Sequence, residues 1–117
     1  MVSRMQRISL APMMDFSTPH FRYLLKLIVP NIKIYTEMFI DRAFIYSKDT
    51  KKFDKWIGPY QPDTVIQLAS NNPDTFCMAI EKLLQHENRF SEFNLNCGCP
   101  SGKLQNIFGA AMMKNPK

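Results

Sequence analysis

The 117-residue chain has few of the features on which secreted and membrane proteins depend. It contains three cysteines, and this odd, low number does not suggest a disulfide framework. No apolar run approaches the roughly 20 residues of a membrane-spanning helix. The apolar stretch near the N-terminus is also too short for a secretory signal. We therefore expect a cytoplasmic protein without membrane contact, although targeting to an organelle stays open.

Metal ligands and phosphate-binding glycines are also scarce. Cys97 and Cys99 form a Cys-x-Cys pair, but His20 and His86 lie far from it, in no spacing typical of a zinc site. The chain has only four glycines, and no Gly-rich turn follows the first apolar run. This argues against a dinucleotide-binding unit of the doubly wound type.

The composition is that of a globular protein with a basic surface. Hydrophobic residues make up 45% of the chain and charged residues 21%, which fits one ordinary domain. The net charge of +5 permits an acidic partner such as RNA. Four lysines cluster in sequence, and a solvated loop explains them more simply than an RNA-binding patch does: Lys48, Lys51, Lys52 and Lys55.

Short apolar runs alternate with amphipathic segments along the chain. The runs predict four strands, at residues 8–13, 33–38, 64–68 and 93–96. Their centres are about 26 to 30 residues apart, a spacing typical of βα units in a parallel sheet. The predicted fold class is therefore α/β, of the (β/α) TIM-barrel type. Because a complete barrel takes about 250 residues, only the first four βα units are expected here. A small doubly wound sheet is the alternative.

Two helices have clear start signals. Thr18 precedes Pro19, and Asn72 precedes Pro73, so each pair offers an N-cap followed by proline at the first helical position. Further helices are expected near residues 40–46 and from Gly109 onward, whereas residues 48–62 are interpreted as a loop with room for a turn of helix. Each of the two main helices has one apolar face, formed by Phe21, Leu24, Leu25 and Ile28 and by Phe76, Ala79, Ile80, Leu83 and Leu84.

Polar side chains gather where the predicted strands end, which is where barrels carry their catalytic residues. Glu37 ends the second strand and Gln67 the third. On the fourth strand, alternation directs Asn94 and Asn96 away from the helices and into the barrel. Buried amides need hydrogen-bond partners, so either a bound ligand or neighbouring loops must supply them. Cys99 follows in the loop, and a thiol of ordinary acidity can donate a proton at neutral pH.

These residues together resemble the tRNA-dihydrouridine synthase family, most closely its A-type subfamily. The resemblance rests on four segments in order: LAPMMDFSTPHFRYLL (10–25), YTEM (35–38), IQLASNNP (66–73) and FNLNCGCPSGKLQNIFGAAMM (93–113). It implies an enzyme that reduces uridine in tRNA to dihydrouridine, with FMN as the cofactor and usually NADPH as the reductant. Cys99 would then be the proton donor to C5 of the uracil ring.

The resemblance also assigns residues to ligands. For the flavin it implies contacts with Pro12, Met13, Met14 and Gln67. For the uridine and the tRNA it implies contacts with Asn96, Glu37 and Lys103.

By the same resemblance, residues 1–117 correspond to the N-terminal half of the FMN-binding barrel. The family's FMN phosphate loops and its helical tRNA-binding domain would lie beyond residue 117, so we expect no turnover from this chain alone. Two other interpretations stay open: a different FMN-dependent barrel oxidoreductase, and a non-catalytic half-barrel that binds RNA or assembles. Unpaired strand edges would favour self-association in that case.

Overall fold

The fold is a parallel α/β sheet with its strands in sequence order. A computed structural model describes residues 8–100 and 108–114. The strands are β1 (Ser9–Leu10), β2 (Lys33–Ile40), β3 (Thr64–Ala69) and β4 (Glu92–Leu95). They form one sheet in the order β1-β2-β3-β4, and every neighbouring pair is parallel. A doubly wound sheet reverses its strand order at a switch point, and no such reversal occurs among these strands. The barrel-type prediction is therefore confirmed.

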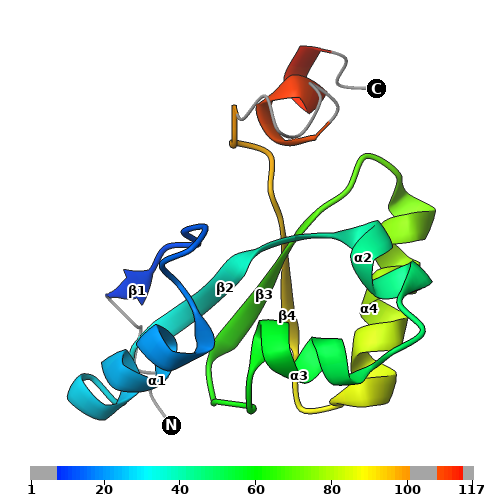
Figure 1. The fold of residues 1–117 in the computed structure, drawn as a ribbon. Coiled ribbons are helices and arrows are strands. Elements are labelled where there is room, and N and C mark those ends of the chain that lie inside the picture. The colour runs from blue at the N-terminus through cyan, green and yellow to red at the C-terminus, as the bar shows by residue number, and fades with distance from the viewer. Residues whose placement is uncertain (1–7, 101–107, 115–117) are drawn as a thin grey trace, which may run out of the picture.

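Helices connect the strands of the sheet. They are α1 (Pro19–Ile28), α2 (Asp41–Tyr46), α3 (Lys51–Ile57) and α4 (Pro73–His86), with the 3-10 helix η2 (Gly109–Lys114) near the C-terminus. Figure 1 shows α2, α3 and α4 together on one side of the sheet, and η2 beyond the carboxyl end of β4. Within the described residues, no helix has the length and apolar character needed to cross a membrane.

Several boundaries differ from those predicted. The strand predicted over residues 8–13 is limited to Ser9–Leu10, because residues 14–17 already form a turn. The loop predicted over residues 48–62 contains the seven-residue helix α3, whose Phe53 and Ile57 are buried. Local sequence signals for α3 are weak, so burial of these two side chains decides its structure.

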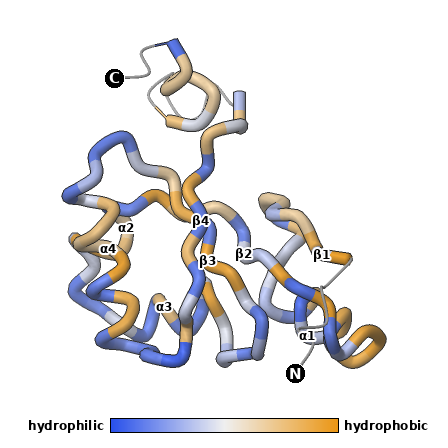
Figure 2. Tube along the Cα trace, turned by 180° about the vertical axis from the view of Figure 1, so that it is seen from behind, coloured by the Kyte–Doolittle hydropathy of each residue, from blue (hydrophilic) through white to orange (hydrophobic). Residues whose placement is uncertain are grey.

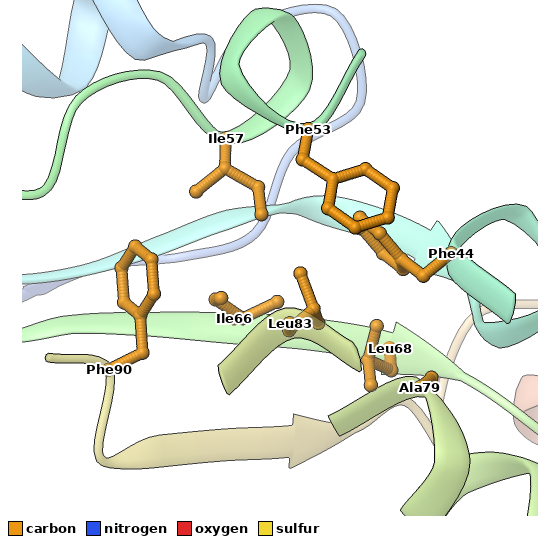
Figure 3. Close-up of a cluster of buried hydrophobic side chains, with 8 residues drawn as sticks. All are labelled: Phe44, Phe53, Ile57, Ile66, Leu68, Ala79, Leu83 and Phe90. Carbon is orange, nitrogen blue, oxygen red and sulfur yellow. The ribbon is translucent and has the colours of Figure 1, made fainter. Parts of the chain in front are cut away.

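The main core lies between the sheet and helices α2, α3 and α4. Figure 3 shows how its side chains meet: Phe44, Phe53 and Ile57 from two helices, Ile66 and Leu68 from β3, Ala79 and Leu83 from α4, and Phe90. The rings of Phe44 and Phe53 meet edge to face, with centroids 5.0 Å apart. This core anchors β3, whose six residues are all buried, and so fixes the position of the strand ends.

Cys77 does not belong to this core. Its side chain is exposed on α4. The apolar face predicted for α4 is buried around Ala79 and Leu83, as expected.

Candidate active site at the carboxyl ends of the strands

A cavity of about 980 Å³ opens where the strands end. Its lining comes from residues 12, 14 and 15 after β1, residues 38–40 of β2, Gln67 of β3, and residues 94–99 of β4 and its loop. Ala43 of α2 and Trp56 of α3 complete an apolar wall. The volume is typical of small-molecule sites, which are mostly apolar and hold a few convergent polar groups.

A register shift in β2 determines which side chains reach this cavity. Tyr35 pairs with Val65, and Met38 pairs with Gln67, so β2 holds one extra residue between the two pairs. Such a bulge reverses the faces of all later residues. Met38 therefore lies beside Gln67, while Phe39 packs against the helix-side core. Thr36 is buried at the bulge, and its Oγ1 accepts a hydrogen bond of 3.1 Å from the backbone N–H of Gln67.

Three amide side chains form a connected row across β3 and β4. Nε2 of Gln67 donates to Oδ1 of Asn94 over 2.7 Å, and Nδ2 of Asn96 donates to Oε1 of Gln67 over 3.1 Å. The second N–H of Asn96 meets Sδ of Met38 at 3.1 Å. These contacts confirm that Asn94 and Asn96 share the face of Gln67, while Phe93 packs on the helix side. The cavity therefore has an ordered polar floor.

The backbone of Cys99 is held from two directions. Oδ1 of Asn96 accepts from the N–H groups of Gly98 and Cys99, at 3.0 and 2.9 Å. The carbonyl of Cys99 accepts from the N–H of Ala110 at 3.1 Å. Gly109 makes this approach feasible, because a Cβ at its φ of 63° would lie 2.4 Å from the Cys99 oxygen. The half-buried Cys99 thus lines the cavity on a constrained backbone.

The loop after β1 is held by a carboxylate of β2. Asp15 has a φ of 65°, and its N–H donates to Oε1 of Glu37 over 2.7 Å. Within the loop, Oγ of Ser17 accepts from the N–H of Met13 at 2.6 Å and donates to the carbonyl of the same residue at 2.8 Å. Glu37 therefore acts on the cavity through the loop that carries Met14 and Asp15.

A buried arginine links this loop to the opposite wall. Arg22 of α1 is 1% exposed. Its Nε donates to the Ser17 carbonyl over 3.1 Å, and its Nη2 donates to the Ile57 carbonyl of α3 over 2.5 Å. Burial lowers the pKa of Arg22 to about 10, and the negative charge of Glu37 partly opposes that shift. The guanidinium therefore stays charged at neutral pH and joins the Ser17 turn to the helix that carries Trp56.

The structure brings most of the predicted site residues together. Five of them line the cavity: Pro12, Met14, Gln67, Asn96 and Cys99. Met13 lies in the adjoining turn, and Glu37 contacts that loop through the backbone of Asp15. Lys103 lies outside the described residues.

Sequence reasoning missed the apolar wall. Four apolar residues also line the cavity: Phe39, Ile40, Ala43 and Trp56. Their places depend on the fold of α3 and on the bulge in β2, which packs Phe39 against the core at the edge of the cavity. Only the polar pair Thr36-Glu37 inside an apolar run hints at the irregularity in the strand.

Known proteins match this chain over almost its whole length. Residues 9–117 match the dihydrouridine synthase (Dus) family. The tRNA-dihydrouridine(20/20a) synthase of Xanthomonas axonopodis pv. citri (strain 306) is 35% identical over 111 residues, which are 94% of this chain and 32% of that protein. The protein of the same name from Escherichia coli (strain K12) is 36% identical over 111 residues, 93% of this chain and 30% of its own length. The chain thus spans about a third of the length of these curated relatives.

Proposed function

Because this chain belongs to the dihydrouridine synthase family, we propose that it forms the N-terminal half of an FMN-binding barrel that reduces uridine in tRNA to 5,6-dihydrouridine. NADPH is the proposed reductant. The relatives are named for positions 20 and 20a, and we assign the same positions to the protein that contains this chain. The observation that carries the proposal is Cys99, which lines the cavity on a backbone held by Asn96 and Ala110.

The cavity suits a flavin ring in size and chemistry. Its walls are largely apolar, with Pro12 and Met14 on one side and Trp56 on another. Gln67 uses one N–H on Asn94, and its second N–H has no acceptor within residues 8–100 and 108–114, so it can meet a ligand acceptor such as a pyrimidine carbonyl. We assign Pro12, Met13, Met14 and Gln67 to flavin binding. When bound and reduced, FMN supplies a hydride to C6 of the uracil ring.

Cys99 completes the reduction as a general acid. Its S–H bond breaks as the proton passes to C5 of the uracil, and the sulfur is left as a thiolate. The site must hold an extruded base against the cofactor, because C5 and C6 are inaccessible in a stacked base. A half-buried thiol on a constrained loop meets the need for a proton at one fixed carbon.

We assign Asn96 to uracil binding, on the condition that the uracil replaces one of its present hydrogen-bond partners. In this structure its oxygen accepts two backbone N–H groups, and its two N–H groups meet Gln67 and Met38. The thioether of Met38 is a weak acceptor. A uracil carbonyl can therefore replace Met38 as the partner of that N–H without disturbing the Cys99 backbone. Glu37 supports the site through Asp15, and Lys103 is assigned to RNA phosphate.

The test is Cys99→Ala in a protein that contains this chain and completes the barrel. Dihydrouridine formation at tRNA positions 20 and 20a should fall by at least about 100-fold, the usual effect of losing a general acid. Reduction of bound FMN by NADPH, followed by bleaching of the flavin absorbance, should stay within about twofold because no thiol takes part in it. Near wild-type tRNA reduction would exclude Cys99 as the acid. Loss of flavin reduction would point instead to a structural defect.

A further inference from the structure

The row of amides beneath Cys99 can run in only one direction. The backbone N–H groups of Gly98 and Cys99 are obligatory donors, so Asn96 must turn its oxygen toward them. Its nitrogen then faces Gln67, which must present Oε1. Nε2 of Gln67 is thereby directed at Asn94, which must present Oδ1. Each carboxamide has one donor atom and one acceptor atom, so the orientation of one fixes the orientation of the next.

Asn94 ends this row as its last acceptor. It stands beside Gln67 in the parallel register of β3 and β4, so the two side chains are neighbours on one face. Without Oδ1 of Asn94, Gln67 keeps only the hydrogen bond from Asn96 to hold its amide in this orientation. A flipped Gln67 would turn its nitrogen toward the nitrogen of Asn96, and two donors would face each other. Asn96 would then lose the hydrogen bond from its Nδ2 to Oε1 of Gln67.

We propose that Asn94 is a positioning residue, which orients Gln67 and Asn96 and through them holds the backbone of Cys99. Among the residues that the structure describes, its side chain is linked to the Cys99 backbone through the side chains of Gln67 and Asn96. The importance of this order for uridine reduction rests on the proposed function, since Gln67, Asn96 and Cys99 are the residues assigned there to flavin, uracil and proton transfer. The order itself is a property of this chain.

Two substitutions separate the acceptor from the rest of the side chain. Asn94→Asp keeps an oxygen for Nε2 of Gln67, whereas Asn94→Leu keeps the branched skeleton of the side chain and has no acceptor. Backbone hydrogen exchange, followed by NMR on the 117-residue chain, reports on the far end of the row. In the leucine variant, exchange of the Cys99 N–H should accelerate at least about fivefold, as expected for loss of an ordinary hydrogen bond. In the aspartate variant it should stay within about twofold of wild type, because the acceptor remains.

Internal controls distinguish this role from general loosening. The N–H groups of Ile66 and Leu68 in the buried strand β3 should exchange at unchanged rates in both variants, because the helix-side core does not include Asn94. Asn31→Leu, at an exposed turn residue, should leave the exchange of Cys99 unchanged. Equal acceleration at Ile66, Leu68 and Cys99 would indicate global destabilisation and overturn the proposal.

Two further results would also overturn it: unchanged exchange at Cys99 in the leucine variant, or equal acceleration in the aspartate variant. If the leucine variant does not fold, Asn94→Ala takes its place in the same comparison, and failure of the aspartate variant to fold counts against the proposal. The measurement needs neither FMN nor tRNA. A negative result in the hydrogen-exchange experiment would not affect the role proposed for Cys99, which the Cys99→Ala variant tests separately. A negative result for Cys99→Ala would likewise not affect the role proposed for Asn94.

Discussion

Helices α1 and α4 have the same kind of start but bury different side chains. Each has proline at its first positions, and the side chain of Thr18 or Asn72 accepts from backbone N–H groups of the first turn. Helix α4 buries the apolar pair Ala79 and Leu83. In helix α1, the buried residue is Arg22. Equivalent capping and an equivalent apolar stripe therefore do not lead to equivalent packing.

The apolar face of α1 lies mostly open in the described part of the chain. Leu24 is 51% exposed and Ile28 is 67% exposed. Figure 2 shows hydrophobic colour at the outer end of this helix. Polar and close backbone contacts fix α1 instead: Arg22 bonds two carbonyls, and a Cβ on Gly58 would come within 2.5 Å of Pro19 Cβ. An amphipathic pattern thus identifies the apolar face of a helix without identifying what covers it.

The largest expected difference between the two helices is in their leucines. Leu83→Ala should lower the free energy of unfolding by about 3 kcal/mol, since it removes a 1% exposed side chain from the core. Leu24→Ala is the matched change on α1, and its cost should stay below about 1 kcal/mol because half of that side chain is already in solvent. Urea unfolding followed by circular dichroism measures both. Equal losses would mean that the α1 face is covered in solution.

The second difference is the cost of replacing the basic residue by which each helix donates to backbone carbonyls outside itself. Arg22→Met should cost about 2 kcal/mol, because two carbonyls around a buried site lose their donor while the apolar stem is kept. Lys82→Met is the counterpart on α4. Nζ of Lys82 donates to the carbonyls of Ile45 and Ser47 at the end of α2, at 2.6 and 3.3 Å.

Loss of Lys82 should cost only about 0.5–1 kcal/mol, since it is half-buried and water can reach the end of a surface helix. The same urea titration compares the two variants. A smaller cost for Arg22→Met than for Lys82→Met would show that α1 does not depend on its arginine. It would also mean that the two hydrogen bonds by which Arg22 joins the Ser17 turn to α3 contribute little to stability.

The sequence predicts what depends on local pattern and fails where packing over a distance decides. Thr18-Pro19 and Asn72-Pro73 mark their helices because capping is a local interaction. Alternation along β4 assigns Asn94 and Asn96 to one face for the same reason. The bulge in β2 has no comparable signal, and it places Met38 in the site and Phe39 in the core. The burial of Arg22 also depends on the Ile57 carbonyl, 35 residues away.

The smallest expected effect lies at the C-terminal end of α4, where Glu87 pairs with Arg89. Hydrogen bonds from Arg89 lower the pKa of Glu87 from its usual 4.5 to about 2. Because the folded-state pKa is depressed, the pair stabilises the fold above about pH 4.5, and this contribution is lost as the pH falls toward 2. Helix α1 offers a contrast, since Lys26 donates to the Ile32 carbonyl over 2.6 Å and its positive charge suits a helix C-terminus.

Glu87→Gln should therefore lower the melting temperature by at most about 2 °C at pH 7, because Arg89 is largely exposed and solvent screens the pair. The difference between variant and wild type should shrink below pH 4.5 and vanish near pH 2. Thermal melts in steps of one pH unit measure this. If the difference in melting temperature persisted at pH 2, the geometry of the helix end would cause it, and not the charge of Glu87. The difference between the ends of α1 and α4 would then not be electrostatic.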